Sequence, residues 1–229
     1  MLLPIANPAG QKDGSICKMT RRSIGRIVAI APLMILTLFS APGGIRVAVA
    51  DGCPNAEVVF ARGTGEPVGP GGAGQAFIDS LTAQLPGRTV NVYPVNYPAT
   101  SDYVNSAMAG AGDAGAHVQS TVANCPHTKM VLGGYSQGAG VVDMTSHQLP
   151  PQIGNHVAAV ALFGNPASTY AKQLSDNQIP AISPAYRPKT IDICLPDDMI
   201  CADGGNMLAH LGYVPDATNQ AATFVAGRL

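Results

Sequence analysis

Residues 129–143 read Lys129-Met-Val-Leu-Gly-Gly-Tyr-Ser-Gln-Gly-Ala-Gly-Val-Val-Asp143, and this stretch decides the fold. It begins as a short apolar strand, turns between glycines and continues as a helix. Gly134, Ser136 and Gly138 match the G-x-S-x-G elbow, in which a serine occupies the tip of a sharp strand-to-helix turn. The glycines let two backbones pass close together, and the helix N-terminus after Ser136 offers unpaired N–H groups to negative charge.

The context of this motif makes it informative, because the pattern alone is weak. The chain has 26 glycines in 229 residues, so a serine can acquire two flanking glycines by chance. An ordinary serine in a glycine-rich turn is therefore the alternative. The apolar run of residues 130–132 ends at the motif and a helix-compatible run follows it, which favours the elbow.

The composition of the chain excludes some classes of function. The formal net charge is −1 and 12% of the residues are charged, so no basic surface argues for a nucleic-acid partner. Hydrophobic residues make up 46% of the chain, which is enough for a sizeable core. Tryptophan is absent and aromatic residues are 5%, which disfavours a carbohydrate site built on stacked tryptophans.

The first 50 residues are typical of a secretory signal peptide. Its parts in order are a basic region (Arg21, Arg22 and Arg26), an apolar run (27–39) and an A-x-A cleavage site (Ala48-Val49-Ala50). The apolar run is broken by Pro32 and is too short to span a bilayer comfortably. We therefore expect a secreted protein that begins near Asp51 and has no transmembrane span in its mature form. Met19 is an alternative start, and attachment to a cell envelope stays open.

The cysteines agree with export to an oxidising compartment. Cys53, Cys125, Cys194 and Cys201 follow the signal, and four cysteines allow three pairings. The spacing favours a local clip between Cys194 and Cys201 and a long staple between Cys53 and Cys125. There is no C-x-x-C pair, so a zinc site is disfavoured, and we predict neither a metal nor a cofactor.

Short apolar strands alternate with helical stretches from residue 51 to residue 229. The expected strands are 57–61, 90–95, 130–132, 156–163 and 189–194, and the expected helices are 73–85, 103–122, 136–147 and 217–229. This alternation indicates an α/β domain built from right-handed βαβ units, with a parallel sheet covered on both faces. In such sheets the functional residues gather at the carboxyl ends of the strands.

A serine hydroxyl needs a base to take its proton and a third group to orient that base. In α/β-hydrolases the acid and the histidine follow the serine in the chain. Three histidines follow Ser136, namely His147, His156 and His210. His147 lies late in the helix after the serine and His156 opens a strand at the wrong end of the sheet. The order argument therefore favours His210, whose segment can fold back over the carboxyl edge.

The acid and the oxyanion donors are expected in loops at the same edge. Asp197, Asp198 and Asp203 follow the fifth strand, and the residues alone do not choose among them. A solvated acidic loop or a weak Ca²⁺ site is the alternative for this cluster. The N–H groups of Gln137 and Thr64 are candidates to stabilise a developing oxyanion. For Thr64 the alternative is a plain turn residue.

Four motifs occur in order: Ala61-Arg-Gly-Thr64, Gly134-Tyr-Ser-Gln-Gly138, Cys194-x3-Asp198-x2-Cys201 and His210. Together they resemble the cutinase family, most closely its secreted actinobacterial members, over residues 51–229. The resemblance implies a lidless three-layer α/β/α sandwich with a five-stranded parallel sheet and two disulfides. It also implies a Ser136–His210–Asp198 triad, with Thr64 and Gln137 forming the oxyanion hole. The family pattern places the acid three residues before the second cysteine of the clip, which selects Asp198.

The expected function is therefore that of a secreted serine esterase. It would hydrolyse carboxylic esters of short to medium acyl chains through an acyl-enzyme on Ser136, as a monomer acting on an ester or lipid substrate. Apolar residues beside the expected site suit an acyl chain or a lipid surface, or simply pack the last loop (Tyr135, Met207, Leu208, Leu211, Tyr213 and Val214). The alternatives are an acetylxylan esterase of the same family, acyl transfer to another alcohol, a non-catalytic binding module on this scaffold, and a metal-dependent hydrolase using Asp197, Asp198, Asp203 and His210.

Overall fold

A computed structural model describes residues 52–229, so the signal peptide predicted for residues 1–50 lies outside the described residues. The strands are β1 (Ala56–Ala61), β2 (Val90–Pro94), β3 (Lys129–Tyr135), β4 (Val157–Phe163) and β5 (Thr190–Ile193). They form one five-stranded sheet in the order β2-β1-β3-β4-β5, and every pairing is parallel. The α/β class and the five-stranded parallel sheet expected from the sequence are confirmed.

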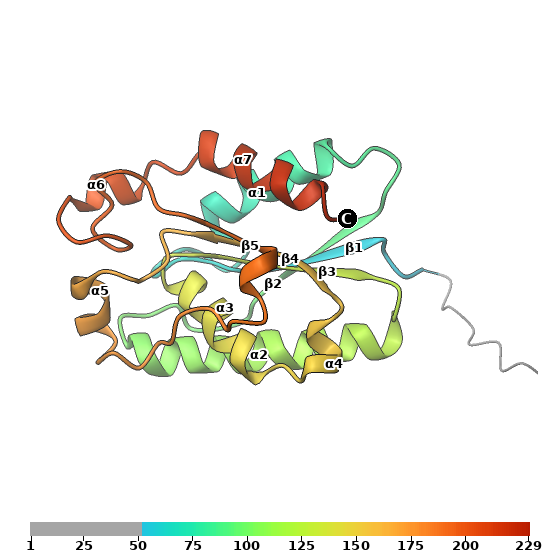
Figure 1. Ribbon diagram of the computed structural model, residues 1–229, viewed down its shortest axis with the longest axis horizontal. Helices are drawn as coiled ribbons and strands as arrows, with labels where there is room; N and C mark the ends of the chain where they lie inside the picture. Colours follow the sequence, from blue (N-terminus) through green and yellow to red (C-terminus); the bar gives the residue numbers. More distant parts are fainter. Residues whose placement is uncertain (1–51) are drawn as a thin grey trace, which may run out of the picture. The chain divides into compact units, whose positions relative to one another are not determined.

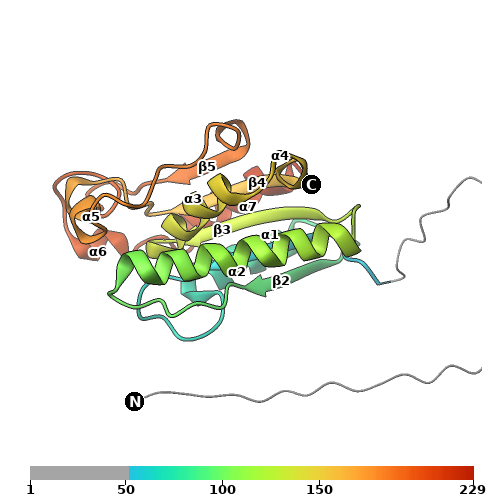
Figure 2. The ribbon, with the colours of Figure 1, turned by 90° about the horizontal axis from the view of Figure 1, so that it is seen from below.

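Helices cover both faces of this sheet, as Figure 1 shows. One face carries α1 (Gly71–Ala83) and α7 (Asp216–Ala226), which pack against each other. The other face carries α2 (Tyr103–Asn124), α3 (Gln137–Gln148) and the short α4 (Pro151–Gly154). Figure 2 shows α2 running along the length of the sheet beside α3. The result is the three-layer sandwich that the alternation of strands and helices predicts.

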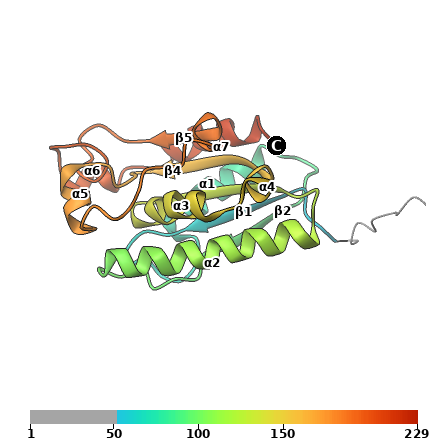
Figure 3. The ribbon, with the colours of Figure 1, turned by 60° about the horizontal axis from the view of Figure 1, so that its bottom comes forward.

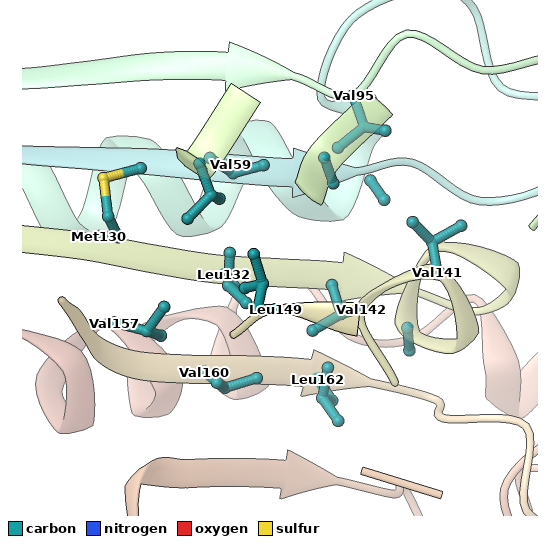
Figure 4. Close-up of a cluster of buried hydrophobic side chains, with 14 of the residues drawn as sticks. Val59, Val95, Met130, Leu132, Val141, Val142, Leu149, Val157, Val160 and Leu162 are labelled. Carbon is teal, nitrogen blue, oxygen red and sulfur yellow. The ribbon is translucent and has the colours of Figure 1, made fainter. Parts of the chain in front are cut away.

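The central strands are apolar on both faces because helices cover both faces. In β1, Val58 and Phe60 point into the cluster under α1 and α7, whereas Val59 and Ala61 point into the cluster under α2 and α3. Figure 4 shows the second cluster, in which Val59 of β1 lies with apolar side chains of β3, β4 and α3. The alternation along the strands therefore builds two cores from one sheet.

Several short helices were absent from the sequence-based expectations. They are α4, α5 (Thr169–Leu174), the 3₁₀ turn η1 (Arg187–Lys189) and α6 (Met207–His210). Elements this short carry no detectable period, and tertiary contacts stabilise them. The Ser168 side chain caps α5 by accepting from the Ala171 amide at 3.0 Å, and Asn206 caps α6 by accepting from the Ala209 amide at 3.0 Å. The longer expected helices occur with ends shifted by a few residues.

Two disulfides close the described chain, and they are the pairs that the spacing favours. Cys53–Cys125 ties the segment before β1 to the end of α2, and Cys194–Cys201 closes the loop after β5. Their Cα–Cα distances are 5.6 and 5.7 Å, in the usual range for disulfides. None of the helices between residues 52 and 229 has the length and apolar character that crossing a membrane requires.

The order of the strands places a crevice at one edge of the sheet. From β1 the chain passes through α1 on one face of the sheet to β2, and from β3 it passes into α3 on the other face (Figure 1). In open parallel sheets ligands bind outside the carboxyl ends of the strands at such a switch point. The short helices α5 and α6 lie together at this same end (Figures 1 and 3).

Candidate active site

Ser136 lies between β3 and α3 in a strained backbone conformation. Its φ is 55° and its ψ is −122°, a combination rarely adopted by residues other than glycine. Its amide donates to the carbonyl of Phe163 at the end of β4, at 2.9 Å. The hydroxyl-bearing residue is therefore fixed by the backbone of two neighbouring strands.

The glycines of the motif allow this turn because no side chain would fit in their place. A Cβ on Gly134 would lie 2.2 Å from the carbonyl oxygen of Gly138, and a Cβ on Gly138 would lie 2.0 Å from that of Ala61. Both neighbours are backbone atoms that cannot rotate away. The G-x-S-x-G spacing thus brings α3 against β3 and β1 directly below Ser136.

Asp198 and His210 form a buried pair after β5. Asp198 is fully buried, and its Oδ2 accepts a hydrogen bond from Nδ1 of His210 at 2.8 Å. Its Oδ1 accepts from the amide of Ile200 at 2.8 Å. A carboxylate on Nδ1 leaves Nε2 as the nitrogen that can take a proton.

The other acidic candidates have different surroundings. Asp197 is exposed, and Asp203 accepts from the amide and the hydroxyl of Thr169 at 2.6 and 3.1 Å. These bonds lower the pKa of Asp203 and tie it to the start of α5. The three aspartates do not converge on one point, and residues 52–229 contain no group of three potential metal ligands.

The other two histidines lie elsewhere. His147 is exposed near the end of α3, where its Nε2 contacts the carbonyl of Ala181 at 2.9 Å. His156 precedes β4, at the amino end of the sheet. Of the histidines after Ser136, only His210 shares a cavity with that serine.

This cavity has a volume of about 650 Å³ and lies at the carboxyl edge of the sheet. It brings together four of the predicted site residues, Thr64, Ser136, Gln137 and His210, with Asp198 behind the imidazole. Apolar side chains from the two sides of its mouth complete the lining (Leu174 and Ile179 from the α5 side; Met207, Leu211 and Val214 from the α6 side). Nε2 of His210 is buried and has no hydrogen-bond partner within residues 52–229.

Two tyrosines hold the imidazole, a role for which the sequence contains no signal. The Tyr135 ring stacks on His210 with centroids 4.9 Å apart, and its hydroxyl donates to the His210 carbonyl at 2.8 Å. Burial raises the pKa of Tyr135 to about 12, so this hydroxyl stays protonated. The Tyr213 ring meets the imidazole edge-on, with centroids 6.1 Å apart. The sequence pattern predicts both tyrosines only as apolar neighbours of the site.

The loop carrying Thr64 is held by its neighbours on either side. The Arg62 guanidinium donates to the carbonyls of Glu66 and Tyr97, both at 2.9 Å. The Glu66 carboxylate accepts from the amides of Gly63 at 2.6 Å and Gly72 at 2.8 Å. These bonds fix the loop on each side of Thr64 and leave its side chain exposed at the cavity.

Two hydrogen bonds hold the amide of the Gln137 side chain. Its Nε2 donates to the carbonyl of Thr100 at 2.8 Å, and the Ser106 hydroxyl donates to its Oε1 at 3.1 Å. Because Gln137 is the first residue of α3, its amide has no partner within that helix. Thr64 and Gln137, which come from two different segments, thus line the same cavity as Ser136.

Comparisons with known proteins identify the family of this chain. The sequence profile named Cutinase matches residues 52–229. Carboxylesterase Culp1 of Mycobacterium tuberculosis is 54% identical over 213 residues, which cover 92% of this chain and 98% of the relative. Phospholipase Culp4 of the same organism is 48% identical over 188 residues, covering 78% and 80%.

Solved structures give the same result. A Trichoderma reesei cutinase in complex with a phosphonate inhibitor is 35% identical with a TM-score of 0.62, covering 76% of each chain. The catalytic core domain of an acetyl xylan esterase from the same organism is 25% identical with a TM-score of 0.66, covering 77% of this chain and all (100%) of that one. By its sequence profile, its relatives and its fold, this chain belongs to the cutinase family.

Proposed function

We propose that this cutinase-family carboxylesterase works through an acyl-enzyme on Ser136. The observation that carries the proposal is the buried Asp198–His210 pair, which presents Nε2 in the same cavity as a serine on a strained turn. The relative Culp1, at 54% identity, is named a carboxylesterase. The site supplies the acyl-transfer groups, namely a nucleophile, a base and an orienting acid.

The first half of the reaction forms the acyl-enzyme. Oγ of Ser136 attacks the carbonyl carbon of the ester while its proton passes to Nε2 of His210. Asp198 holds the Nδ1 proton and stabilises the resulting imidazolium. The bond from the carbonyl carbon to the alcohol oxygen then breaks, and His210 returns its proton to that oxygen, which releases the alcohol.

The second half repeats these steps with water. A water molecule attacks the acyl carbon and gives a proton to His210, and the proton returns to Oγ of Ser136 as the carboxylic acid leaves. In both halves the amides of Gln137 and Thr64 face the negative charge that develops on the carbonyl oxygen. Preorganised donors of this kind supply one of the largest contributions to catalysis.

The substrate class follows from the lining of the cavity. Leu174, Ile179, Met207 and Leu211 offer apolar contact to an alkyl chain on two sides of the site. We infer that short and medium alkyl esters are preferred over acetylated xylan. Initial rates on a series of p-nitrophenyl alkanoates and on acetylated xylan test this inference. A preference for the polysaccharide, or a rate that keeps rising into the long-chain esters, would contradict it.

The location of the protein is inferred from its covalent structure. Two disulfides in a member of the cutinase family fit a protein that works outside the cytoplasm. We further infer that it is secreted as a monomer after removal of the predicted signal peptide. N-terminal sequencing of the exported protein and its sedimentation behaviour check both points.

Replacement of the nucleophile tests the proposed function. Ser136→Ala should lower kcat for p-nitrophenyl butyrate by about 10⁶-fold, leaving only catalysis by the oxyanion donors and binding. The matched control is Ser120→Ala on the exposed face of α2, which should leave kcat unchanged. If the Ser136→Ala enzyme hydrolysed the ester at the parent rate, Ser136 would not be the nucleophile.

A further inference from the structure

Tyr213 places a hydroxyl on the same carboxylate oxygen that binds the imidazole. Its Oη donates to Oδ2 of Asp198 at 2.6 Å, and Nδ1 of His210 donates to that oxygen at 2.8 Å. The amide of Leu195 donates to the tyrosine oxygen at 3.3 Å and so holds it in place. Tyr213 lies three residues after His210, and only 1% of its surface is exposed.

The surroundings make this hydrogen bond important to the acid. Asp198 is 0% exposed, so water cannot replace a lost donor. Its buried oxygens therefore need donors from the protein, and here these come from Ile200, His210 and Tyr213. Burial, followed by the hydrogen bond to Asp198, raises the pKa of Tyr213, so its hydroxyl remains a donor over the whole working range of pH.

Packing alone does not account for the hydroxyl. The Tyr213 ring fills the core against Phe163 and Tyr135, with centroids 6.0 and 5.8 Å apart. A phenylalanine would fill the same space and make the same ring contacts. The oxygen adds contacts only to Asp198, to the Leu195 amide and, at 3.7 Å, to the sulfur of Cys201. All of them lie in the loop that carries the acid.

We propose that Tyr213 is a positioning residue, whose hydroxyl fixes the Asp198 carboxylate and limits the negative charge that Oδ2 presents to His210. This inference rests on the proposed function, because Tyr213 acts on the reaction only through Asp198 and His210. Two donors share one oxygen, so each weakens the acceptor strength available to the other. Tyr213 thereby weakens the pull of Oδ2 on the Nδ1–H group of His210.

Removal of the Tyr213 hydroxyl should shift the pH dependence of activity in a predictable direction. Without Tyr213 Oη, Oδ2 becomes a stronger acceptor for Nδ1–H and favours the imidazolium, which cannot take a proton from Ser136. In addition, the buried carboxyl loses a donor that favours its ionised form. Both changes reduce activity on the acid side, so the acid limb of the pH–rate profile should move to higher pH.

The test is the pH dependence of kcat/KM for p-nitrophenyl butyrate in Tyr213→Phe. We expect the acid limb to move up by roughly one pH unit, and the plateau kcat to fall by up to about tenfold with little change in KM. The matched control is Tyr93→Phe, because Tyr93 of β2 also donates to a carboxylate, that of Asp113, at 3.0 and 3.1 Å. Tyr93 lies outside the cavity, so its variant should keep the parent profile.

A folded Tyr213→Phe enzyme, with a Tm near that of the parent and an unchanged acid limb, would overturn the inference. If Tyr213→Phe does not fold, 3,5-difluorotyrosine at position 213 provides the test. It keeps the aromatic ring, and its hydroxyl is a stronger hydrogen-bond donor. The acid limb should then move to lower pH, and an unchanged limb would overturn the inference. An active Ser136→Ala enzyme would instead overturn the proposed function, whereas an inactive one with an unchanged Tyr213→Phe profile would overturn only the role of Tyr213.

Discussion

The proposed nucleophile elbow (residues 134–138) and the proposed acid–base loop (residues 194–214) lie at one edge of the sheet, but different interactions hold them. The elbow continues β3, which pairs with β1 and β4, and backbone contacts fix it. The acid–base loop contains no strand of the sheet. Its backbone has an isolated bridge between Asp198 and Asn206, and the Ile200 carbonyl accepts from the amides of Ala167 and Ser168 at 3.1 Å. A disulfide, the Asn206 cap and the Tyr213 hydroxyl also hold it. The elbow should therefore tolerate no added volume, whereas the loop should depend on particular donors and cross-links.

The largest effect is expected where one methyl group is added to the elbow. Gly138→Ala would place its Cβ 2.0 Å from the carbonyl oxygen of Ala61, and we expect a loss of about 5 kcal/mol of unfolding free energy. Gly112→Ala in α2 is the matched control, because nothing lies within 4 Å of its Cβ. It should gain up to about 1 kcal/mol from helix propensity. Urea unfolding measures the free energy of unfolding of both variants. Equal stabilities would contradict the expectation that the elbow tolerates no added volume.

Removal of either disulfide should lower stability, but only removal of the short one should lower activity. Replacing Cys53 and Cys125 by serine opens a loop of 72 residues and should cost about 4 kcal/mol while kcat stays unchanged. Replacing Cys194 and Cys201 opens a loop of 7 residues and should cost only about 2 kcal/mol. The second change should nevertheless lower kcat, because the clip shapes the segment around Asp198. Chemical denaturation and ester hydrolysis of both double variants check this, and a parent kcat without the short disulfide would contradict it.

Asp143 lies on α3, the helix that follows the elbow. Its titration should make the stability of the protein, rather than kcat, depend on pH. Burial raises its pKa to about 8, and its Oδ1 has no partner within residues 52–229. Between its usual value of about 4 and about 8, the folded protein holds a proton that the unfolded chain lacks, so stability falls as pH rises.

The expected fall is about 3 kcal/mol between pH 5 and pH 7, and it should level off above pH 8. Asp143→Asn should abolish this slope without moving the pH–rate profile. Thermal unfolding from pH 4 to pH 9 measures the slope. A wild-type stability that is flat across this range, or that rises with pH, would contradict the assignment.

The smallest effect is expected at the loop that carries Thr64. Glu66→Gln would set an amide N–H against one of the backbone donors of Gly63 and Gly72, displacing Thr64 slightly. We expect kcat to fall about tenfold, which is less than the loss of an oxyanion donor. Asp79→Asn on the exposed face of α1 is the matched carboxylate-to-amide control and should leave kcat unchanged. Steady-state kinetics distinguish the two variants, and a parent kcat in Glu66→Gln would contradict this role of the carboxylate.

The same contrast explains what the sequence could predict. The strands and the elbow follow from local patterns, since apolar runs and paired glycines act on the backbone within a few residues. The order of residues in the chain favours His210. Only the family resemblance selects Asp198 over Asp197, because a turn at Asp197, with φ of 63°, decides which side chain is buried.

The rest of the acid–base side depends on partners far apart in the chain. Asp203 binds Thr169 at the start of α5, 34 positions away, and Tyr135 binds the carbonyl of His210, 75 positions away. No periodic pattern encodes such contacts, so neither the short helices nor the role of Tyr135 and Tyr213 in holding the imidazole could be expected from the sequence.

Covalent labelling with a fluorophosphonate, followed by peptide mapping, tests the central claim most directly. Such a reagent reacts with a serine only when a neighbouring base activates it. The label should be found on Ser136 alone, and labelling should become slow in His210→Ala. A label on another residue, or labelling of His210→Ala at the parent rate, would contradict an esterase in which His210 activates Ser136.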